Sequence, residues 1–170
     1  MYSLNVPVPG RVAALAREIA RELPAATARV RGEHTLGAKR FAIDGPSDYS
    51  HLEAEVRQLL VGQPAFEARI DEIAVFEDPP VGDAPVVYFA VESPGLVALH
   101  RTLLSAFGPV HERIEGEQYV PHVTIARGGS MDAARRVADR EIEPIEWTVT
   151  ELHFWDATHD RSVSTLSLPA

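Results

Sequence analysis

Two histidine-containing segments hold the residue types that could carry out acid–base chemistry. The stronger segment covers residues 119–127, YVPHVTIAR, in which His122 precedes Thr124 by two positions. Side chains alternate along a strand, so we expect these two to face one way while the apolar residues beside them pack behind. An imidazole can transfer a proton while a neighbouring hydroxyl donates to a phosphate oxygen. An ordinary edge strand with a solvent-facing histidine and threonine would show the same pattern.

The second segment covers residues 33–41, EHTLGAKRF, and places His34 at the equivalent point of the other half of the chain. Two imidazoles on opposite sides of a phosphorus can divide a hydrolysis, since one accepts a proton from water and the other protonates the leaving oxygen. Their ordinary pKa of about 6.5 lets both roles coexist at neutral pH. Here the threonine follows one position after the histidine, and position 36 is leucine. Thr35 therefore faces away from His34 on a regular strand, unless a bulge at Gly37 re-aims it.

Basic and hydroxyl side chains near the two histidines are candidates for substrate contacts. Lys39 or Arg40 could replace the hydroxyl that Leu36 does not supply; Arg40 shares strand parity with His34, whereas Lys39 does not. The predicted substrate-binding residues are Thr124, Thr35, Lys39, Arg40, Arg127 and Tyr119, with His34 and His122 as the catalytic pair.

Composition narrows the chemistry further. The chain has no cysteine, which excludes disulfides, thiol catalysis and cysteine-ligated metals. His100 is on the apolar side of an expected helix, and residues 153–160, HFWDATHD, match no standard metal-ligand spacing. We expect neither a metal nor a cofactor.

The charge balance restricts the partners. Twenty-five acidic and 16 basic side chains give the 170-residue chain a net charge of -9. Such a surface repels the phosphate backbone, so stable duplex binding is not expected, although a small basic pocket for an RNA end or a small cyclic nucleotide is compatible with it. No apolar run approaches the roughly 20 residues that cross a bilayer, and the N-terminal segment has no secretory pattern. We expect a cytoplasmic monomer without membrane contact.

The order strand, helix, histidine strand, helix, strand occurs twice and is followed by a final strand. This order predicts one α+β domain over residues 1–170, with two pseudo-symmetric lobes, each an antiparallel sheet with helices, and a central cleft carrying both histidines. A capping box of Ser50 and Glu53 is expected at the second helix, and serine caps at Ser93 and Ser130. The expected strands are 2–8, 31–43, 66–76, 86–92, 118–127, 145–155 and 162–168, and the expected helices follow Pro9 and cover 50–61, 93–107 and 130–140.

With these motifs, nearly the whole chain resembles the 2H phosphoesterase superfamily, in particular its 2'-5' RNA ligase-like members, which act as RNA 2',3'-cyclic phosphodiesterases. Residues 119–124 carry the more specific part of the resemblance, and the opening strand ending in Pro7-Val8-Pro9 also fits. The resemblance implies that His34 and His122 are the catalytic pair and that Thr124 binds the phosphate. It also implies a reaction without a metal that leaves a 2'-phosphate, with His122 activating water and His34 protonating the leaving oxygen.

The expected function is hydrolysis of a 2',3'-cyclic phosphate, either at an RNA end or in a cyclic nucleotide. Two alternatives stay open. The same histidines could join RNA ends through a 2'-5' bond or cut such a bond, because ligation is the reverse chemistry. The displaced Thr35 also motivates a non-catalytic module that binds a nucleotide or RNA end.

Overall fold

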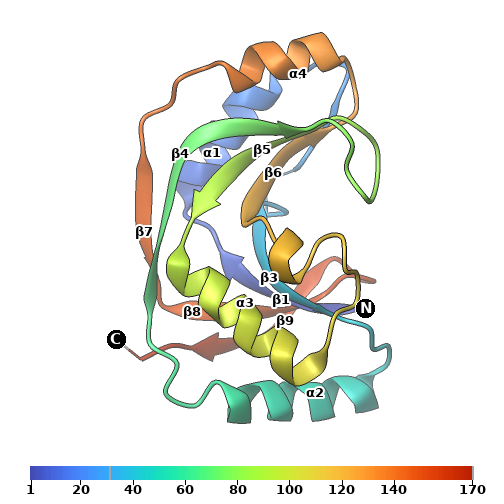
Figure 1. Cartoon of the computed structure of the whole chain (residues 1–170), viewed down its shortest axis with the longest axis vertical. Helices are drawn as coiled ribbons and strands as arrows, with labels where there is room; N and C mark the ends of the chain where they lie inside the picture. Colours follow the sequence, from blue (N-terminus) through green and yellow to red (C-terminus); the bar gives the residue numbers. More distant parts are fainter. Residues whose placement is uncertain (31, 170) are drawn as a thin grey trace.

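Two lobes share one curled antiparallel sheet in the computed structural model, which describes residues 1–30 and 32–169 (Figure 1). The strands that the structure describes lie in the order β7-β4-β5-β6-β3-β1-β8-β9, and the short β2 pairs with β6 outside this path. The elements in chain order are β1 (Tyr2–Pro7), α1 (Gly10–Ala20), β2 (Thr27–Ala28), β3 (Thr35–Phe41), α2 (Pro46–Leu59), β4 (Phe66–Phe76), β5 (Val86–Glu92), α3 (Pro94–Phe107), the 3-10 turn η1 (Gly116–Gln118), β6 (His122–Arg127), α4 (Met131–Ala138), β7 (Ile145–Val149), β8 (Glu151–Asp156) and β9 (Arg161–Ser167). The predicted α+β class is confirmed.

The sheet is symmetric about its centre. β6 and β3 form the central pair; β5, β4 and β7 lie beyond β6, while β1, β8 and β9 lie beyond β3. β4 comes from the first half of the chain but pairs in the lobe of β6, and β8 makes the reverse crossing into the lobe of β3. Each lobe therefore contains strands from both halves of the chain.

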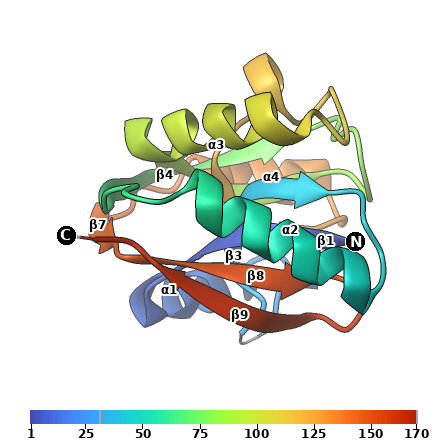
Figure 2. The same ribbon diagram turned by 90° about the horizontal axis from the view of Figure 1, so that it is seen from below.

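The helices follow the same symmetry. α1 lies against β6, and α3 lies against β3. α2 covers the outer side of β8 and β9 (Figure 2), where the hydroxyls of Tyr49 and Ser164 are 2.8 Å apart and Arg57 donates to the carbonyl of Thr165. α4 lies against β4 and β5 in the other lobe. A helix thus shields each end of the sheet's convex side.

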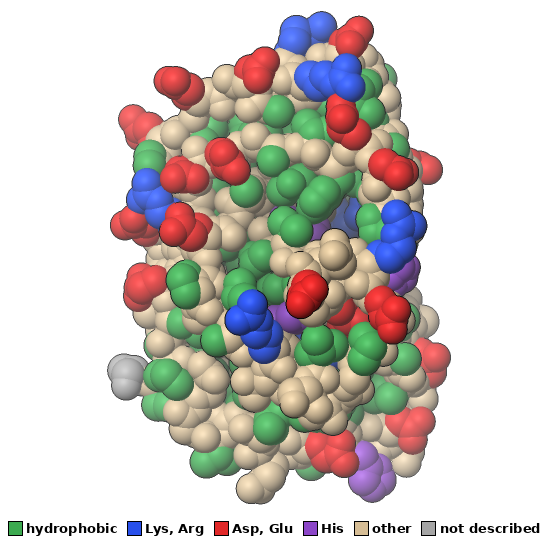
Figure 3. All heavy atoms as spheres, viewed as in Figure 1, with side chains coloured by type: hydrophobic (Ala, Val, Ile, Leu, Met, Phe, Trp, Pro, Cys, Tyr) green, Lys and Arg blue, Asp and Glu red, His purple; other side chains and the backbone are tan. Residues whose placement is uncertain are grey.

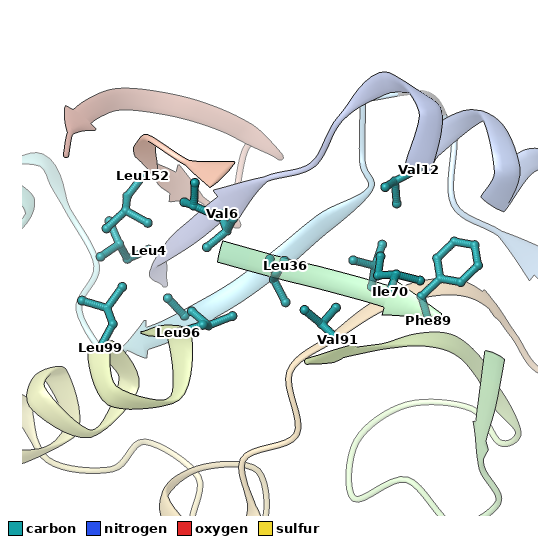
Figure 4. Close-up of a cluster of buried hydrophobic side chains, with 14 of the residues drawn as sticks. Leu4, Val6, Val12, Leu36, Ile70, Phe89, Val91, Leu96, Leu99 and Leu152 are labelled. Atoms are coloured by element: carbon teal, nitrogen blue, oxygen red, sulfur yellow. The ribbon is translucent and has the colours of Figure 1, made fainter. Parts of the chain in front are cut away.

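The core lies where the two lobes join (Figure 4). Leu4 and Val6 of β1, Leu36 of β3 and Phe89 of β5 are all fully buried there. They come from strands on both sides of the central pair, so the alternating apolar faces of β3 and β6 pack into one cluster. Burial of such side chains, each about 1.5–3 kcal/mol, holds the central strands in register.

Most element predictions are confirmed, and the failures are local. β4 and β5 have the predicted bounds. The side chains of Ser93 and Ser130 cap α3 and α4 by accepting hydrogen bonds from the N–H groups of Leu96 and Ala133. The predicted strand 145–155 is wrong as one element, because it divides into β7 and β8 in opposite lobes.

The predicted capping box at α2 is also wrong. The helix begins four residues earlier, at Pro46, and its N-cap is Gly45. Proline is suited to the first helical position because its fixed φ is helical and its missing N–H has no partner there in any case. The Ser50 hydroxyl instead donates back to the carbonyl of Pro46.

A buried ion pair fastens β3 to the segment that leads into β6. The ammonium of Lys39 is 2.6 Å from the carboxylate of Glu115, and the two side chains are 0 % and 4 % exposed. The other carboxylate oxygen of Glu115 accepts from the N–H groups of Val110 and His111. Burial works to raise the pKa of Glu115, but the hydrogen bonds from Lys39 and these backbone groups hold it below its ordinary value.

Replacing Glu115 by glutamine should lower the free energy of unfolding by about 3 kcal/mol, because it leaves the Lys39 charge buried without a counter-charge. Urea denaturation measures this change. Glu77→Gln is the matched control, since its pair with Arg135 is exposed and should be worth less than about 1 kcal/mol. Equal losses in the two variants would contradict the assigned role of the buried pair.

Candidate active site

A cavity of about 490 Å³ opens beside the two central strands. β6 contributes His122 and Thr124 to its lining, and β3 contributes Thr35 and Gly37. Arg29, which follows β2, and Arg40 and Arg127 at the ends of β3 and β6 complete a basic wall. Outside it, acidic side chains are spread over the face of the molecule in Figure 3, with basic side chains among them.

The His122 ring is held in one tautomer. β6 begins directly after Pro121, and the Nδ1 atom of His122 is 2.7 Å from the carbonyl oxygen of Val120. A carbonyl only accepts, so Nδ1 carries the proton and Nε2 keeps its lone pair. The rings of Phe76 and Tyr88 pack edge-on against the imidazole, with centroids 5.3 and 5.5 Å away. The second motif thus presents a fixed proton acceptor.

Burial is the main cause that lowers the pKa of His122, and the positive charges of Arg127, Arg40 and Arg29 lower it further. The hydrogen bond to the Val120 carbonyl offsets only part of this. The imidazole is therefore neutral at neutral pH, the form that can accept a proton from water.

Three arginines surround this histidine without carboxylate partners. Within the part of the chain that the structure describes, Arg29, Arg40 and Arg127 form no ion pair. Burial first, then repulsion from the other two, lowers the pKa of Arg127, and Asp83 opposes this effect. Like charges held together at this cost form a site for an anion.

β-bulges aim two of these arginines into the cavity. Across β1 and β3, Asn5 pairs with Gly37 but Leu4 pairs with Lys39, so Ala38 is the extra residue. The bulge reverses the parity beyond it and places Arg40 on the cavity side.

The second bulge is in β6. Tyr88 of β5 pairs with Thr124, but Val87 pairs with Ala126, so Ile125 is the extra residue. Arg127, whose odd offset from His122 predicts the opposite face on a regular strand, lines the cavity for this reason.

The structure does not bring His34 and His122 together. His34 lies just before β3, is only 6 % exposed, and is absent from the cavity lining. Strand alternation puts it on the core side with Leu36, while Thr35 and Gly37 face the cavity. The structure therefore does not show the predicted cleft lined by both histidines.

The surroundings of His34 are those of a core residue. Neither ring nitrogen has a hydrogen-bond partner among the described residues. Burial, followed by the charges of Arg17 and Arg29, lowers the pKa of His34. The position of Thr35, one residue after the histidine instead of two, was the sequence signal of this displacement.

Two further predicted contacts have structural partners instead. Lys39 is committed to Glu115 and to the carbonyl of Arg40, so its ammonium is not free for a phosphate. The hydroxyl of Tyr119 donates to the carbonyl of Gly37 at 2.7 Å, and its ring stacks on His100. Tyr119 lines the cavity, but its proton is engaged there.

Sequence reasoning missed three residues around His122: Arg29, Phe76 and Tyr88. None of them is near His122 in the sequence, and the strand pairing brings them there. No group of three His, Asp or Glu side chains among the described residues could hold a metal ion. None of the described helices is long and apolar enough to cross a membrane.

A family described as the 2'-5' RNA ligase superfamily matches residues 5–161 of the chain. No curated protein sequence matches it. Among solved structures, TT0787 of Thermus thermophilus is 18 % identical with a TM-score of 0.69, over 98 % of this chain and 97 % of that one. LigT of E. coli complexed with 3'-AMP is 16 % identical with a TM-score of 0.69, over 99 % of this chain and 98 % of that one.

Usb1 of Kluyveromyces marxianus is a more distant match: it is 12 % identical with a TM-score of 0.58, over 99 % of this chain and 97 % of that one. At these identities the structural likenesses show a shared fold, and chemistry has to be argued from the site.

The His34→Leu variant should be more stable than the wild type by about 1 kcal/mol at pH 7, because it removes two unpaired buried nitrogens. The pKa of His34 is lowered in the folded state, so the unfolded chain takes up a proton first as pH falls. The free energy of unfolding of the wild type therefore decreases below about pH 6.5, whereas that of the variant has no such contribution. The difference in stability between the two grows towards pH 5.

Urea unfolding at pH 7 and pH 5 measures both effects. His51→Leu makes the same change on the exposed face of α2 and should show no such growth in stability. A destabilised His34→Leu variant would contradict the assignment of His34 to the core.

Proposed function

Because the chain belongs to the 2'-5' RNA ligase superfamily, we propose that it hydrolyses a 2',3'-cyclic phosphate, at an RNA end or in a cyclic nucleotide, with His122 as its working histidine. Membership itself supports an activity on phosphate esters, of the phosphoesterase or ligase type. The observation that carries the finer proposal is a neutral His122 with a free Nε2 beside three arginines that form no ion pair among the described residues. One of them, Arg127, donates to the carbonyl of Val81 and keeps its other donors.

The proposed binding step is electrostatic. Arg29, Arg40 and Arg127 attract the phosphate, and the hydroxyl of Thr124 donates to one of its oxygens. The acidic exterior makes this cavity a local exception, which favours a short ligand over a long duplex. The structures of E. coli LigT complexed with 3'-AMP, ATP and NADP+ support a ligand of nucleotide size.

In the proposed chemical step, Nε2 of His122 takes a proton from water as the water attacks phosphorus. The ring bond to the 3'-oxygen breaks with its electron pair on that oxygen, which takes up a proton from solvent to become a hydroxyl, and a 2'-phosphate remains. Charge accumulates on the phosphoryl oxygens as the water attacks, and the arginines are in place to stabilise it. A positioned base of this kind contributes about 10²–10⁴-fold to the rate.

A second candidate is a module that binds a nucleotide or RNA end without turnover. The specific observation in its favour is that Thr35 and Gly37, not His34, face the cavity from the first lobe. Both candidates need the arginines; only the first needs the lone pair of His122.

Ligation of RNA ends would use the same base on an RNA 5'-hydroxyl. Identifying the product, ligated or hydrolysed, distinguishes ligation from hydrolysis.

Phosphorus NMR of 2',3'-cyclic AMP with the protein in EDTA should show a 2'-monophosphate. His122→Ala should reduce the rate by 10²-fold or more, because it removes the general base. His34→Leu should stay within about threefold of wild type. Binding of 2'-AMP, followed by calorimetry, should survive His122→Ala but weaken at least tenfold in Arg127→Ala, which removes one charge-assisted contact of about 1.5–3 kcal/mol.

Equal loss of rate in His34→Leu and His122→Ala would overturn the single-histidine site. Intact binding of 2'-AMP without turnover of the cyclic nucleotide or a cyclic-ended oligonucleotide would establish the binding module instead.

The rate should also fall with acidity. The pKa of His122 is lowered, so kcat/KM should be flat at neutral pH and decline only below about pH 6.5, where the imidazole begins to protonate. Replacing Arg40 by glutamine removes one of the charges that lower this pKa, so the acid limb should move to higher pH. An acid limb that does not move in Arg40→Gln would contradict the electrostatic coupling between these two groups.

A further inference from the structure

We propose that the first lobe of this site supplies no proton to the leaving oxygen, because Thr35 occupies the position that the internal symmetry of the sheet equates with His122. The inference rests on the proposed hydrolysis and deepens it. It makes the basicity of the leaving group the property that selects substrates: phosphodiesters with a weakly basic leaving oxygen are cut faster than alkyl esters.

The pairing at the centre of the sheet is compatible with this symmetry, and the bulges in the two strands define it. β3 and β6 are antiparallel neighbours, and Leu36 is opposite Val123. Both side chains are fully buried and belong to the same core cluster. A two-fold axis that passes through this pair exchanges Leu36 with Val123, and it then also exchanges the preceding residues, Thr35 and His122.

The bulges support this correspondence independently. The extra residue of β3 is Ala38, two positions after Leu36, and the extra residue of β6 is Ile125, two positions after Val123. Each bulge is followed, two positions later, by an arginine that lines the cavity: Arg40 in the first lobe and Arg127 in the second.

The segments TLGAKR (35–40) and HVTIAR (122–127) therefore correspond residue by residue. Both lobes keep the core residue, the bulge and the arginine. In the first lobe, threonine stands in the place of His122, and Gly37 stands in the place of Thr124. His34 is one residue outside this frame and faces the core.

Among the described residues of the first lobe, the alternative donors Lys39, Tyr119 and His100 have other partners. Lys39 is consumed by its buried pair with Glu115, and Tyr119 gives its proton to the Gly37 carbonyl. His100 is buried, with Nδ1 bonded to the Ala38 carbonyl and Nε2 accepting from a backbone N–H. Three carboxyl groups, Glu33, Glu115 and Asp160, also line the cavity, and a carboxyl group donates only in its protonated form. Glu115 is already bonded to Lys39 and to two backbone N–H groups.

The step balances without a second histidine. Water forms the new P–O bond and gives its proton to Nε2 of His122. The bond from phosphorus to the leaving oxygen breaks, and that oxygen departs with its electron pair beside the arginines. It then takes a proton from solvent water, and His122 returns its own proton to solvent. The cost of this route rises with the basicity of the leaving oxygen, because nothing neutralises it as the bond breaks.

The first lobe has room for the missing group. A Cβ atom added at Gly37 would meet only the side-chain oxygen of Asn5, at 4.0 Å. An imidazole at position 35, two residues before this glycine, would reach into the cavity that His122 also lines. Thr35→His is therefore a direct test, and Thr35→Gln is its matched control of similar size without an acid.

The experiment compares two substrates of one cavity: 2',3'-cyclic AMP, whose leaving group is an alkyl oxygen, and thymidine 5'-(4-nitrophenyl) phosphate, whose leaving group is a weakly basic aryl oxide. Wild type should cut the aryl ester at least 10²-fold faster. Compared with Thr35→Gln, Thr35→His should have about 10²-fold higher turnover of the cyclic nucleotide, as a general acid provides, but less than about threefold higher turnover of the aryl ester. Thr35→Gln and Glu33→Gln should raise neither rate.

Equal wild-type rates on the two substrates would overturn the inference, and this comparison needs no variant to fold. A gain in Thr35→Gln equal to that in Thr35→His would overturn it too, as would a selective loss of cyclic-nucleotide turnover in Glu33→Gln. If wild type turns over neither substrate, the proposed hydrolysis fails by itself. The inference then stands if Thr35→His creates turnover of the cyclic nucleotide, and falls if it does not.

Discussion

The pairing of Leu36 with Val123 at the centre of the sheet is the constraint on which the rest of the structure depends. Both side chains must point into the core, because their burial joins the lobes. Because side chains alternate along a strand, the residues directly before them, His122 and Thr35, then face the cavity, and His34 does not. This register, rather than the number of histidines in the chain, determines which histidine can take part in chemistry in the cavity.

Electrostatics reinforces the same arrangement. Burial and the charges of three nearby arginines keep His122 neutral, with its lone pair directed away from the Val120 carbonyl. The charge of Lys39, the only lysine of the chain, is neutralised by Glu115. The positive charge that remains in the cavity is carried by guanidinium groups, which hold phosphate oxygens in a fixed geometry. Because the chain as a whole carries a net charge of -9, anions are repelled from most of its surface and attracted to this cavity.

Much of this could be predicted from the sequence, where local patterns decide the structure. The apolar stripes and serine caps of α3 and α4, and the alternation in His122-Val123-Thr124, depend on neighbours a few residues away. The place of His34 could not be predicted in this way, because a one-residue register is set by long-range pairing with β1 and β6. Bulges at Ala38 and Ile125, which aim Arg40 and Arg127, have no local signature either.

The most direct test of the central claim is NMR of the histidine ring nitrogens during titration with adenosine 2'-phosphate, at pH 7 and low salt. The account predicts that the Nε2 signal of His122 shifts on binding, while both ring signals of His34 stay where they are because the ring is enclosed in the core. Shifts of similar size at both histidines would contradict the account, since they would place His34 in the cavity with the phosphate.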